Sequence, residues 1–423
     1  MFDSLDERIA PAGITEIAFV GTVLTVSGVG NNNNAITISG NDSALLITES
    51  GPGTIVNRTA GQFTNGGAIP AWVTGVAVNG NNGTDTITIG DGVGGGLTLT
   101  NRSFSATAEF LTVVGDILTD GNGAGGKGGA VTLTGQIALN PVGGMFTGIT
   151  IDSNVPAPGA DGLVRLDGLV TGSAVLTSFL VDSGETGNFT VTKPLTMPAT
   201  GAVLSVQANN VSLNRVTLAE ATSSVIIQSY NATTHSADLT VGATISIAAN
   251  FYGVGGEGYI ANGNLTTTSG AGSISLSTSG TGSITLRRVD AGGTFPASVS
   301  IISGGFINDA NGTLVNIRSV DLDMSAARAI SVDTQIATLN ATTTTGTGGS
   351  IRISNAGTLT IAGNVSTVDG AIDITNAGGI TVNVANTVIA GGLRRNLSMV
   401  ANGAGSTITL DNTGAVAGQL QAY

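Results

Sequence analysis

Residues 348–384 read GGSIRISNAGTLTIAGNVSTVDGAIDITNAGGITVNV, and this stretch contains the same unit twice. With a shift of 21 residues, 350–361 (SIRISNAGTLTI) falls on 371–382 (AIDITNAGGITV). Each copy has an apolar-x-apolar strand, an Asn-Ala-Gly corner and a second such strand. Because side chains alternate along a strand, Ile351 and Ile353 face one side of it. The corner contains glycine, for which a left-handed backbone costs little.

The same pattern of strand, polar or glycine corner and strand recurs along the chain, with corners of variable length. This repetition predicts one architecture, a parallel β-helix or β-solenoid. Helical periodicity is weak, and the clearest helix candidate, residues 103–114, is interrupted by β-branched residues. The further copies are AITISGNDSALLIT (35–48), TITIGDGVGGGLTLT (86–100), VTLTGQIAL (131–139), SISLSTSGTGSITL (273–286) and LSMVANGAGSTITL (397–410).

Tandem antiparallel β-sandwich domains are the alternative, because SIRIS-NAG-TLTIA would also make a three-residue hairpin. In the hairpin, Ile353 faces Leu359 or its neighbour across the turn. In the solenoid, residues 21 apart stack at about 4.8 Å, so Asn355 lies over Asn376 and Arg352 lies over Asp373. We prefer the solenoid, because the shift of 21 preserves the corner as well as the strands.

Composition limits the core and the partners. The chain has 423 residues, of which 41% are hydrophobic but only 4% aromatic, so the core must be aliphatic. Fourteen Lys and Arg against 27 Asp and Glu give a net charge of −13, which makes nucleic acid a poor partner. Without cysteine there are no disulfides, catalytic thiolates or Cys-ligated zinc. No run approaches the roughly 18 apolar residues of a membrane helix, so we expect no membrane span.

The pattern loosens in the middle of the chain, where five of the nine prolines lie between residues 141 and 200. Proline cannot donate to a strand ladder, so these prolines predict a boundary near residue 160. We therefore expect an N-terminal arm (1–20), a β-rich repeat region (21–160), a looser β region (161–265) and a regular solenoid region (266–423).

Residues 5–12 read LDERIAPA. They resemble the LEERxAPA-type element near the start of many large surface and extracellular proteins of planctomycete and verrucomicrobial bacteria. The resemblance implies a secreted or envelope-associated bacterial chain, although Asp6 replaces the usual Glu and the longer basic leader is missing. We expect a neighbouring copy to hold the arm through Leu5, Arg8, Ile9 and Pro11. The alternative is a short charged helical turn that Pro11 ends.

A second resemblance covers GTLTIAGNVSTVDGAIDITNAGGITVNV (357–384), which is similar to the haemagglutinin-type β-helices of secreted adhesins. The pattern is degenerate, and it implies the fold more than a ligand.

Residues 80–88, GNNGTDTIT, resemble the GGxGxDxUx calcium nonapeptide of RTX-type β-rolls. A carboxylate and turn carbonyls are oxygen ligands suited to Ca²⁺, so Asp85, with Asp91, is a candidate calcium site. RTX sites need adjacent copies, and this copy stands alone. An ordinary Asn-Gly turn is the alternative, and we expect no other cofactor.

Other candidates for chemistry have simpler explanations. Asp238 follows His235 by three residues, but the sequence contains no GxSxG nucleophile elbow. We therefore expect His235 to be a surface histidine rather than a member of a Ser-His-Asp triad. Asp321 and Asp323 share a strand face, and we expect both to be exposed to solvent. Residues 250–263, NFYGVGGEGYIANG, suggest a surface loop, or a carbohydrate or partner contact through Tyr252 and Tyr259.

These observations favour a structural protein rather than an enzyme. We expect a self-assembling extracellular subunit of a surface filament, sheath or S-layer-like lattice, with copies joined head to tail through strand edges. Cell-surface polysaccharide is a possible further partner. Two alternatives stay open: an adhesin or glycan-binding β-helix module, and a solenoid polysaccharide hydrolase or lyase with carboxylates on consecutive turns.

Overall fold

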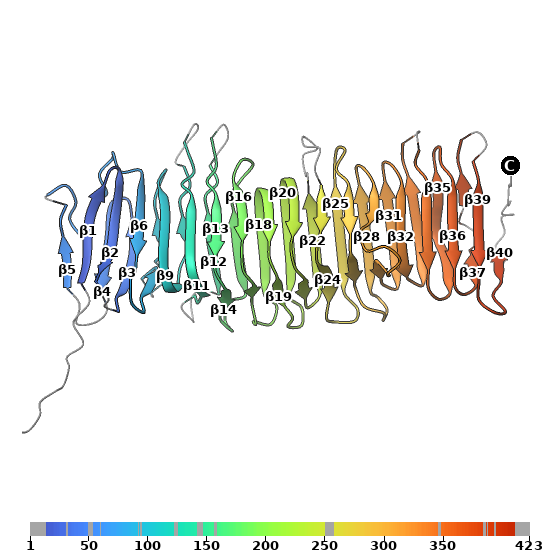
Figure 1. The fold of residues 1–423 in the computed structure, drawn as a ribbon, viewed down its shortest axis with the longest axis horizontal. Helices are drawn as coiled ribbons and strands as arrows, with labels where there is room; N and C mark the ends of the chain where they lie inside the picture. The colour runs from blue at the N-terminus through green and yellow to red at the C-terminus, as the bar shows by residue number, and fades with distance from the viewer. Residues whose placement is uncertain are drawn as a thin grey trace, which may run out of the picture. The chain divides into compact units, whose positions relative to one another are not determined.

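The computed structural model describes residues 14–30, 33–49, 54–59, 61–91, 93, 95–121, 126–141, 147–155, 159–249, 258–345, 348–383, 386, 388–392 and 395–410. Within these ranges the chain is all-β, and no helix capable of crossing a membrane is present. The chain divides into two units, Met1–Thr196 (unit 1) and Met197–Tyr423 (unit 2). Each unit is a parallel β-solenoid, in which most strands pair with strands from the turns before and after (Figure 1). The predicted fold class is confirmed.

Unit 1 begins with two antiparallel hairpins and continues in parallel ladders. Its strands are β1 (Ile14–Val20), β2 (Val23–Val29), β3 (Ala35–Asn41), β4 (Ala44–Glu49), β5 (Thr54–Asn57), β6 (Gly75–Asn79), β7 (Thr86–Ile89), β8 (Leu97–Thr98), β9 (Ser103–Val113), β10 (Ile117–Leu118), β11 (Val131–Leu139), β12 (Gly148–Asp152), β13 (Val164–Asp167), β14 (Val170–Gly172), β15 (Ser178–Asp182), β16 (Asn188–Val191) and β17 (Leu195–Thr196).

Unit 2 has parallel pairing between its described strands. These are β18 (Val203–Leu213), β19 (Val216–Leu218), β20 (Ser224–His235), β21 (Leu239–Val241), β22 (Thr244–Ala249), β23 (Tyr259–Ala261), β24 (Asn264–Thr267), β25 (Ser273–Thr278), β26 (Ile284–Leu286), β27 (Arg288–Asp290), β28 (Ser298–Ser303), β29 (Ile307–Asp309), β30 (Ile317–Arg318), β31 (Asp321–Ala326), β32 (Ile330–Gln335), β33 (Thr338–Thr343), β34 (Ile351–Asn355), β35 (Leu359–Thr367), β36 (Ile372–Asn376), β37 (Ile380–Val382), β38 (Val388–Ala390), β39 (Leu397–Ala401) and β40 (Ile408–Leu410).

Alternation along each strand builds the core. In β11, Val131 and Leu133 are fully buried, whereas Thr132 between them lies on the outer face and is half-buried. Strand β11 then bends at Gly135, whose φ is +139°. A Cβ there would meet the carbonyl oxygen of Ala108 on the preceding turn at 1.9 Å, so only glycine fits the bend.

The unit found twice in the sequence folds as the solenoid predicts. Strand β34 pairs in parallel with β36, which places Ile351 opposite Ile372 and Ile353 opposite Ile374. Arg352 lies opposite Asp373 in the same ladder. Ile353 therefore does not face Leu359 across a hairpin, and the sandwich alternative is wrong.

The two Asn-Ala-Gly corners stack as the shift of 21 requires. Asn355 lies opposite Asn376, and its Nδ2 donates a hydrogen bond of 2.8 Å to the Asn376 side-chain oxygen. Gly357 has a φ of +118°, which is the left-handed backbone expected of the corner. Gly378 serves a different need, because a Cβ there would lie 2.5 Å from the carbonyl oxygen of Gly357.

One sequence expectation differs from the structure. Residues 35–48 fold as the antiparallel hairpin of β3 and β4 rather than as a stacked turn. Asn41 causes the reversal, because its side-chain oxygen accepts from the backbone N–H groups of Ser43 and Ala44. Residues 103–113 form strand β9, in accord with the weak helical periodicity of this stretch. Phe104, Ala106, Leu111 and Val113 are its buried side chains in two parallel ladders.

Unit 1 ends at Thr196 and unit 2 begins at Met197. The expected boundaries near residues 160 and 265 stay predictions. Residues 14–20 of the expected arm form β1, which pairs with β2 and β5 of the same chain. Pro141, Pro194 and Pro198 lie outside strands, in accord with their missing N–H.

Candidate functional site

The candidate calcium residues lie apart, at opposite ends of strand β7. Asp85 precedes the strand and Asp91 follows it. Asp91 accepts hydrogen bonds from the N–H groups of Val93 and Gly95, so its carboxylate shapes its own turn. Among the described residues, no group of three or more His, Asp or Glu side chains is placed to hold a metal ion.

Asp85 connects neighbouring turns of unit 1. Its Oδ1 accepts from the backbone N–H of Asn34 at 2.7 Å, and its own N–H donates to the carboxylate of Glu109 at 3.0 Å. The side chain is fully buried and its Oδ2 has no hydrogen-bond partner. Burial, with Glu109 and Glu49 nearby, raises the pKa of Asp85 above its usual value. These contacts assign Asp85 a role in holding the corner.

The candidate contact tyrosines have different positions. Tyr252 lies outside the described residues. Tyr259 lies in strand β23, is 1% exposed, and its hydroxyl is 2.6 Å from Nε2 of His235. The expectation of a surface loop is wrong for residues 259–261, because their strand is built into a ladder.

His235 is 1% exposed, so the expectation of a surface histidine is wrong. Its Nδ1 lies 2.8 Å from the carbonyl oxygen of Ala237. An N–H at Nδ1 leaves Nε2 to accept from the hydroxyl of Tyr259, which satisfies both ring nitrogens. Burial lowers the pKa of His235. No sequence feature marked this pair, because the ladder that joins β20 to β23 brings the two residues together.

A row of aspartates in unit 1 was missed by sequence reasoning. Asp152 on β12 lies opposite Asp182 on β15. Partial burial, with Asp182, Asp120 and Asp161 nearby, raises the pKa of Asp152 to about 6. Each of the two paired carboxylates also accepts from the N–H two residues later, Asp152 from Asn154 and Asp182 from Gly184. These turns give the row a structural role at a corner of the solenoid.

Asp321 and Asp323 share the outer face of β31, as alternation predicts. Asp323 is exposed, as expected, but Asp321 is half-buried and accepts a hydrogen bond of 2.5 Å from the hydroxyl of Thr338. Asp323 accepts from the side-chain amide of Asn340 on the same neighbouring strand. Both carboxylates therefore link β31 to β33.

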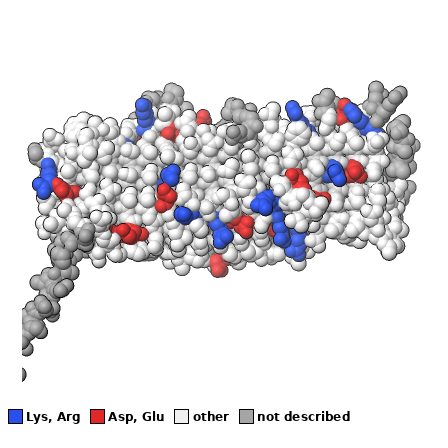
Figure 2. Space-filling model, viewed as in Figure 1, with Lys and Arg blue, Asp and Glu red and all other residues white. Residues whose placement is uncertain are grey.

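Several described arginines form local ion pairs with carboxylates. Arg288 contacts Asp290 at 2.7 Å and Arg395 contacts Asp369 at 2.7 Å. On the face shown in Figure 2, basic and acidic side chains lie in small mixed groups on a largely uncharged surface.

The described strands with the highest numbers, β38, β39 and β40, form a group that we call the C-terminal edge. Among described strands, each pairs with one neighbour only, β35, β36 and β37 respectively. The apolar side chains that stack from turn to turn are less buried in these strands than in the preceding turn. Ile380 is 0% exposed, whereas Ile408 in the same column is 43% exposed. Val382 is 8% exposed, and Leu410 is 52% exposed.

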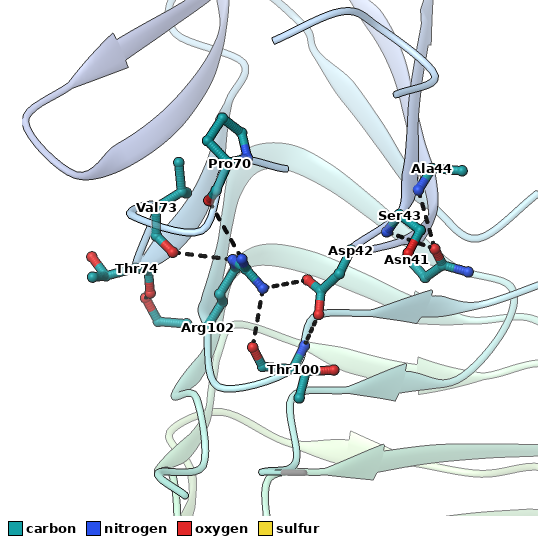
Figure 3. Close-up of polar contacts among 10 residues, drawn as sticks. Asn41, Asp42, Ser43, Ala44, Pro70, Val73, Thr74, Thr100 and Arg102 are labelled. Atoms are coloured by element: carbon teal, nitrogen blue, oxygen red, sulfur yellow. Dashed lines mark hydrogen bonds and ion pairs between the residues drawn. The ribbon is translucent and has the colours of Figure 1, made fainter. Parts of the chain in front are cut away.

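The N-terminal end of the described chain differs from the C-terminal edge, because residues 61–74 cover the outer edge of β4. Arg102 fixes this segment to unit 1 (Figure 3). Its guanidinium contacts the carboxylate of Asp42 at 2.7 Å and donates to the backbone carbonyl oxygens of Val73 at 3.0 Å and Pro70 at 3.4 Å. The Arg102 side chain is only 12% exposed, so these bonds are shielded from water.

The candidate assembly residues Leu5, Arg8, Ile9 and Pro11 lie outside the described residues. Comparison with known proteins found no match among protein-family models, curated proteins or solved structures. At the C-terminal edge, the described strands present backbone groups and half-exposed apolar side chains.

Proposed function

We propose that this chain is a structural, self-associating protein rather than an enzyme. Copies join head to tail into a filament, sheath or lattice outside the cell or on its surface. The outer edges of β4 and β5 in unit 1, the N-terminal edge, are the head, and the C-terminal edge is the tail.

The observation that carries this proposal is the state of the C-terminal edge. An unpaired strand edge presents a row of N–H and C=O groups that can bond to another strand. Here the same strands also carry half-exposed continuations of the core columns, ending at Ile408 and Leu410. Pairing with a second copy would satisfy the backbone groups and remove apolar surface from water together.

The geometry of such a contact favours open growth. Head and tail are different surfaces, so their contact is heterologous, and a filament grows where the rotation between successive copies does not close a ring. The extracellular location is supported by the LDERIAPA element. The interior suits repetitive stacking, because its aliphatic columns repeat from turn to turn.

Electron microscopy and sedimentation velocity of the purified chain test the proposal. We expect extended assemblies for the wild type. The tail variant Val400→Lys/Ile408→Lys places two charges on the C-terminal edge, at side chains that are 40% and 43% exposed. It should remain monomeric, because edge charges oppose strand pairing.

The control is Val175→Lys, which introduces one lysine at a side chain that is 45% exposed in unit 1, outside any strand. It should assemble as the wild type does. Single wild-type particles at all concentrations would contradict the proposal, and single particles that bind polysaccharide would favour the adhesin alternative.

A further inference from the structure

Residues 61–74, the strap, run across the N-terminal edge. Three apolar side chains anchor the strap in the core of unit 1: Phe63 is 3% exposed, Ile69 is 5% exposed and Val73 is 3% exposed. Trp72 remains 45% exposed but packs on Phe19 of β1, with 4.6 Å between ring centroids. The strap is therefore a packed part of the unit.

The strap bonds to the outer edge of β4 as a strand would. Gly66 donates its N–H to the carbonyl oxygen of Leu45 at 2.8 Å, and Leu45 donates to the carbonyl oxygen of Gly67 at 3.0 Å. At Ile47 the partner is a side chain. The amide of Asn65 accepts from the Ile47 N–H at 2.8 Å and donates to the Ile47 carbonyl oxygen at 2.7 Å.

These four bonds show what kind of ligand the β4 edge accepts. A primary amide presents the same donor and acceptor as a peptide group, so every partner at Leu45 and Ile47 has peptide chemistry. Leu45 and Ile47 are also fully buried, so their backbone groups need such partners. The strap occupies a surface that fits an extended strand.

Arg102 connects the strap to the body of unit 1. It reaches two strap carbonyls, those of Pro70 and Val73, and is held by Asp42, which lies in the turn between β3 and β4. The second oxygen of Asp42 accepts from the N–H of Thr100, which fixes the carboxylate in place. Ile69 adds a backbone bond of 2.8 Å to the Asp42 carbonyl oxygen.

We propose that the strap is a removable guard of the N-terminal edge, that Arg102 is its latch, and that strap release opens β4 to the C-terminal edge of a second copy. The proposal rests on the proposed head-to-tail assembly for its partner, whereas the latch is measured independently. While the strap is bound, β4 offers no free backbone group at Leu45 or Ile47. Growth at the head therefore depends on strap release.

Trp72 reports the position of the strap directly, because it is the only tryptophan of the chain. In Arg102→Ala, the Pro70 and Val73 carbonyls and the Asp42 carboxylate lose their shared partner. We expect Trp72 emission to shift to longer wavelength and its quenching by acrylamide to increase. Hydrogen exchange at the Leu45 and Ile47 amides should become at least about tenfold faster.

A second variant and a control keep the result interpretable. Asn65→Leu keeps the latch but removes the amide at Ile47, and should accelerate exchange at Ile47 more than at Leu45. The control is Arg165→Ala, which removes the ion pair with Asp167 in the same unit, where the arginine side chain is 45% exposed. Trp72 and both amides should behave there as in the wild type.

Association is then measured with and without a functional tail. Arg102→Ala should assemble faster than the wild type, by sedimentation and light scattering. In the Val400→Lys/Ile408→Lys background the same change should release the strap without assembly, because the head has no tail to bind. This pair of results separates the latch from the proposed function.

Unchanged Trp72 quenching and amide exchange in Arg102→Ala would overturn the latch. A released strap with assembly no faster than in the wild type would overturn the guard, even if the wild type forms filaments. If no variant assembles although the strap is released, both the proposed function and the guard are wrong, and the latch alone stands.

Discussion

Asn355 shows at the scale of one residue how stacked turns satisfy buried polar groups. Its side-chain oxygen accepts from the Thr334 hydroxyl and from the Ile336 N–H, both at 2.9 Å, while its amide donates to Asn376. Asn376 in turn donates to the carbonyl oxygen of Gly379 at 2.9 Å. Partners from the preceding and following turns satisfy Asn355, and the row ends within the turn of Asn376 itself.

Replacing Asn355 by alanine breaks this row in its middle. The Ile336 N–H, the Thr334 hydroxyl and the Asn376 oxygen lose a partner in a buried position. We expect the free energy of unfolding of unit 2 to fall by about 2–4 kcal/mol, measured by urea denaturation. The control Asn340→Ala removes a surface bond to Asp323 and should cost less than about 0.5 kcal/mol. Equal effects would contradict the buried row.

Asp152 makes unit 1 sensitive to pH. Its pKa is about 6 in the folded chain against 3.8 for an unperturbed group, so the folded state binds a proton more readily than the unfolded state. Stability from this group therefore increases as pH falls from about 6 towards 3.8. Asp152→Asn should stabilise unit 1 by about 1 kcal/mol at pH 8 after allowance for solvent screening. A thermal denaturation series from pH 4 to 8 checks both, and a flat wild-type profile would contradict the assignment.

His235 gives unit 2 the opposite dependence. Burial lowers its pKa below the usual 6.5, so the unfolded state binds the proton more readily. Stability is complete above pH 6.5 and decreases as pH falls below that value. Hydrogen exchange in β20 and β23 should accelerate between pH 6.5 and 4.5 after correction for intrinsic rates. In His235→Gln, which cannot titrate, that acceleration should be absent; its persistence would assign the effect to another group.

At the scale of the element, strand and corner work together. Strands β34 and β36 could be predicted from their alternation, and their partners from the shared corner. Gly378 has no positive φ, yet the Gly357 carbonyl beneath it leaves no room for a Cβ. The glycine is required by the stacking of two corners rather than by its own turn.

Gly378→Ala should therefore force the two corners apart. We expect a loss of about 1–3 kcal/mol in the stability of unit 2, measured by urea denaturation. Gly148→Ala is the control, because its Cβ would meet nothing closer than 3.4 Å, and its effect should be small. If Gly378→Ala lowers the stability no more than Gly148→Ala does, the two corners can accommodate a Cβ and the prediction is wrong.

At the scale of the whole molecule, charge opposes the proposed association. Every copy carries a net charge of −13, so like copies repel at low ionic strength. Strand pairing and apolar contact at the C-terminal edge do not depend on attraction between opposite charges. We expect assembly, measured by sedimentation, to increase between 20 and 500 mM NaCl. These test concentrations lie on either side of about 0.1 M, where the Debye length is about 10 Å. Dissolution of assemblies by salt would indicate an ionic contact instead.

The sequence by itself determined the all-β class, the parallel stacking of residues 21 apart and the inward face of each strand. These follow from local alternation and from a corner that repeats with the strands. The tertiary structure alone decided that residues 35–48 turn back as a hairpin, that His235 and Tyr259 meet in the core, and that Arg102 holds the strap over β4. These contacts join residues 24 or more positions apart, or depend on a side chain that competes with the ladder. The residues that stabilise these contacts are therefore distant in the sequence, and a local sequence pattern does not identify them.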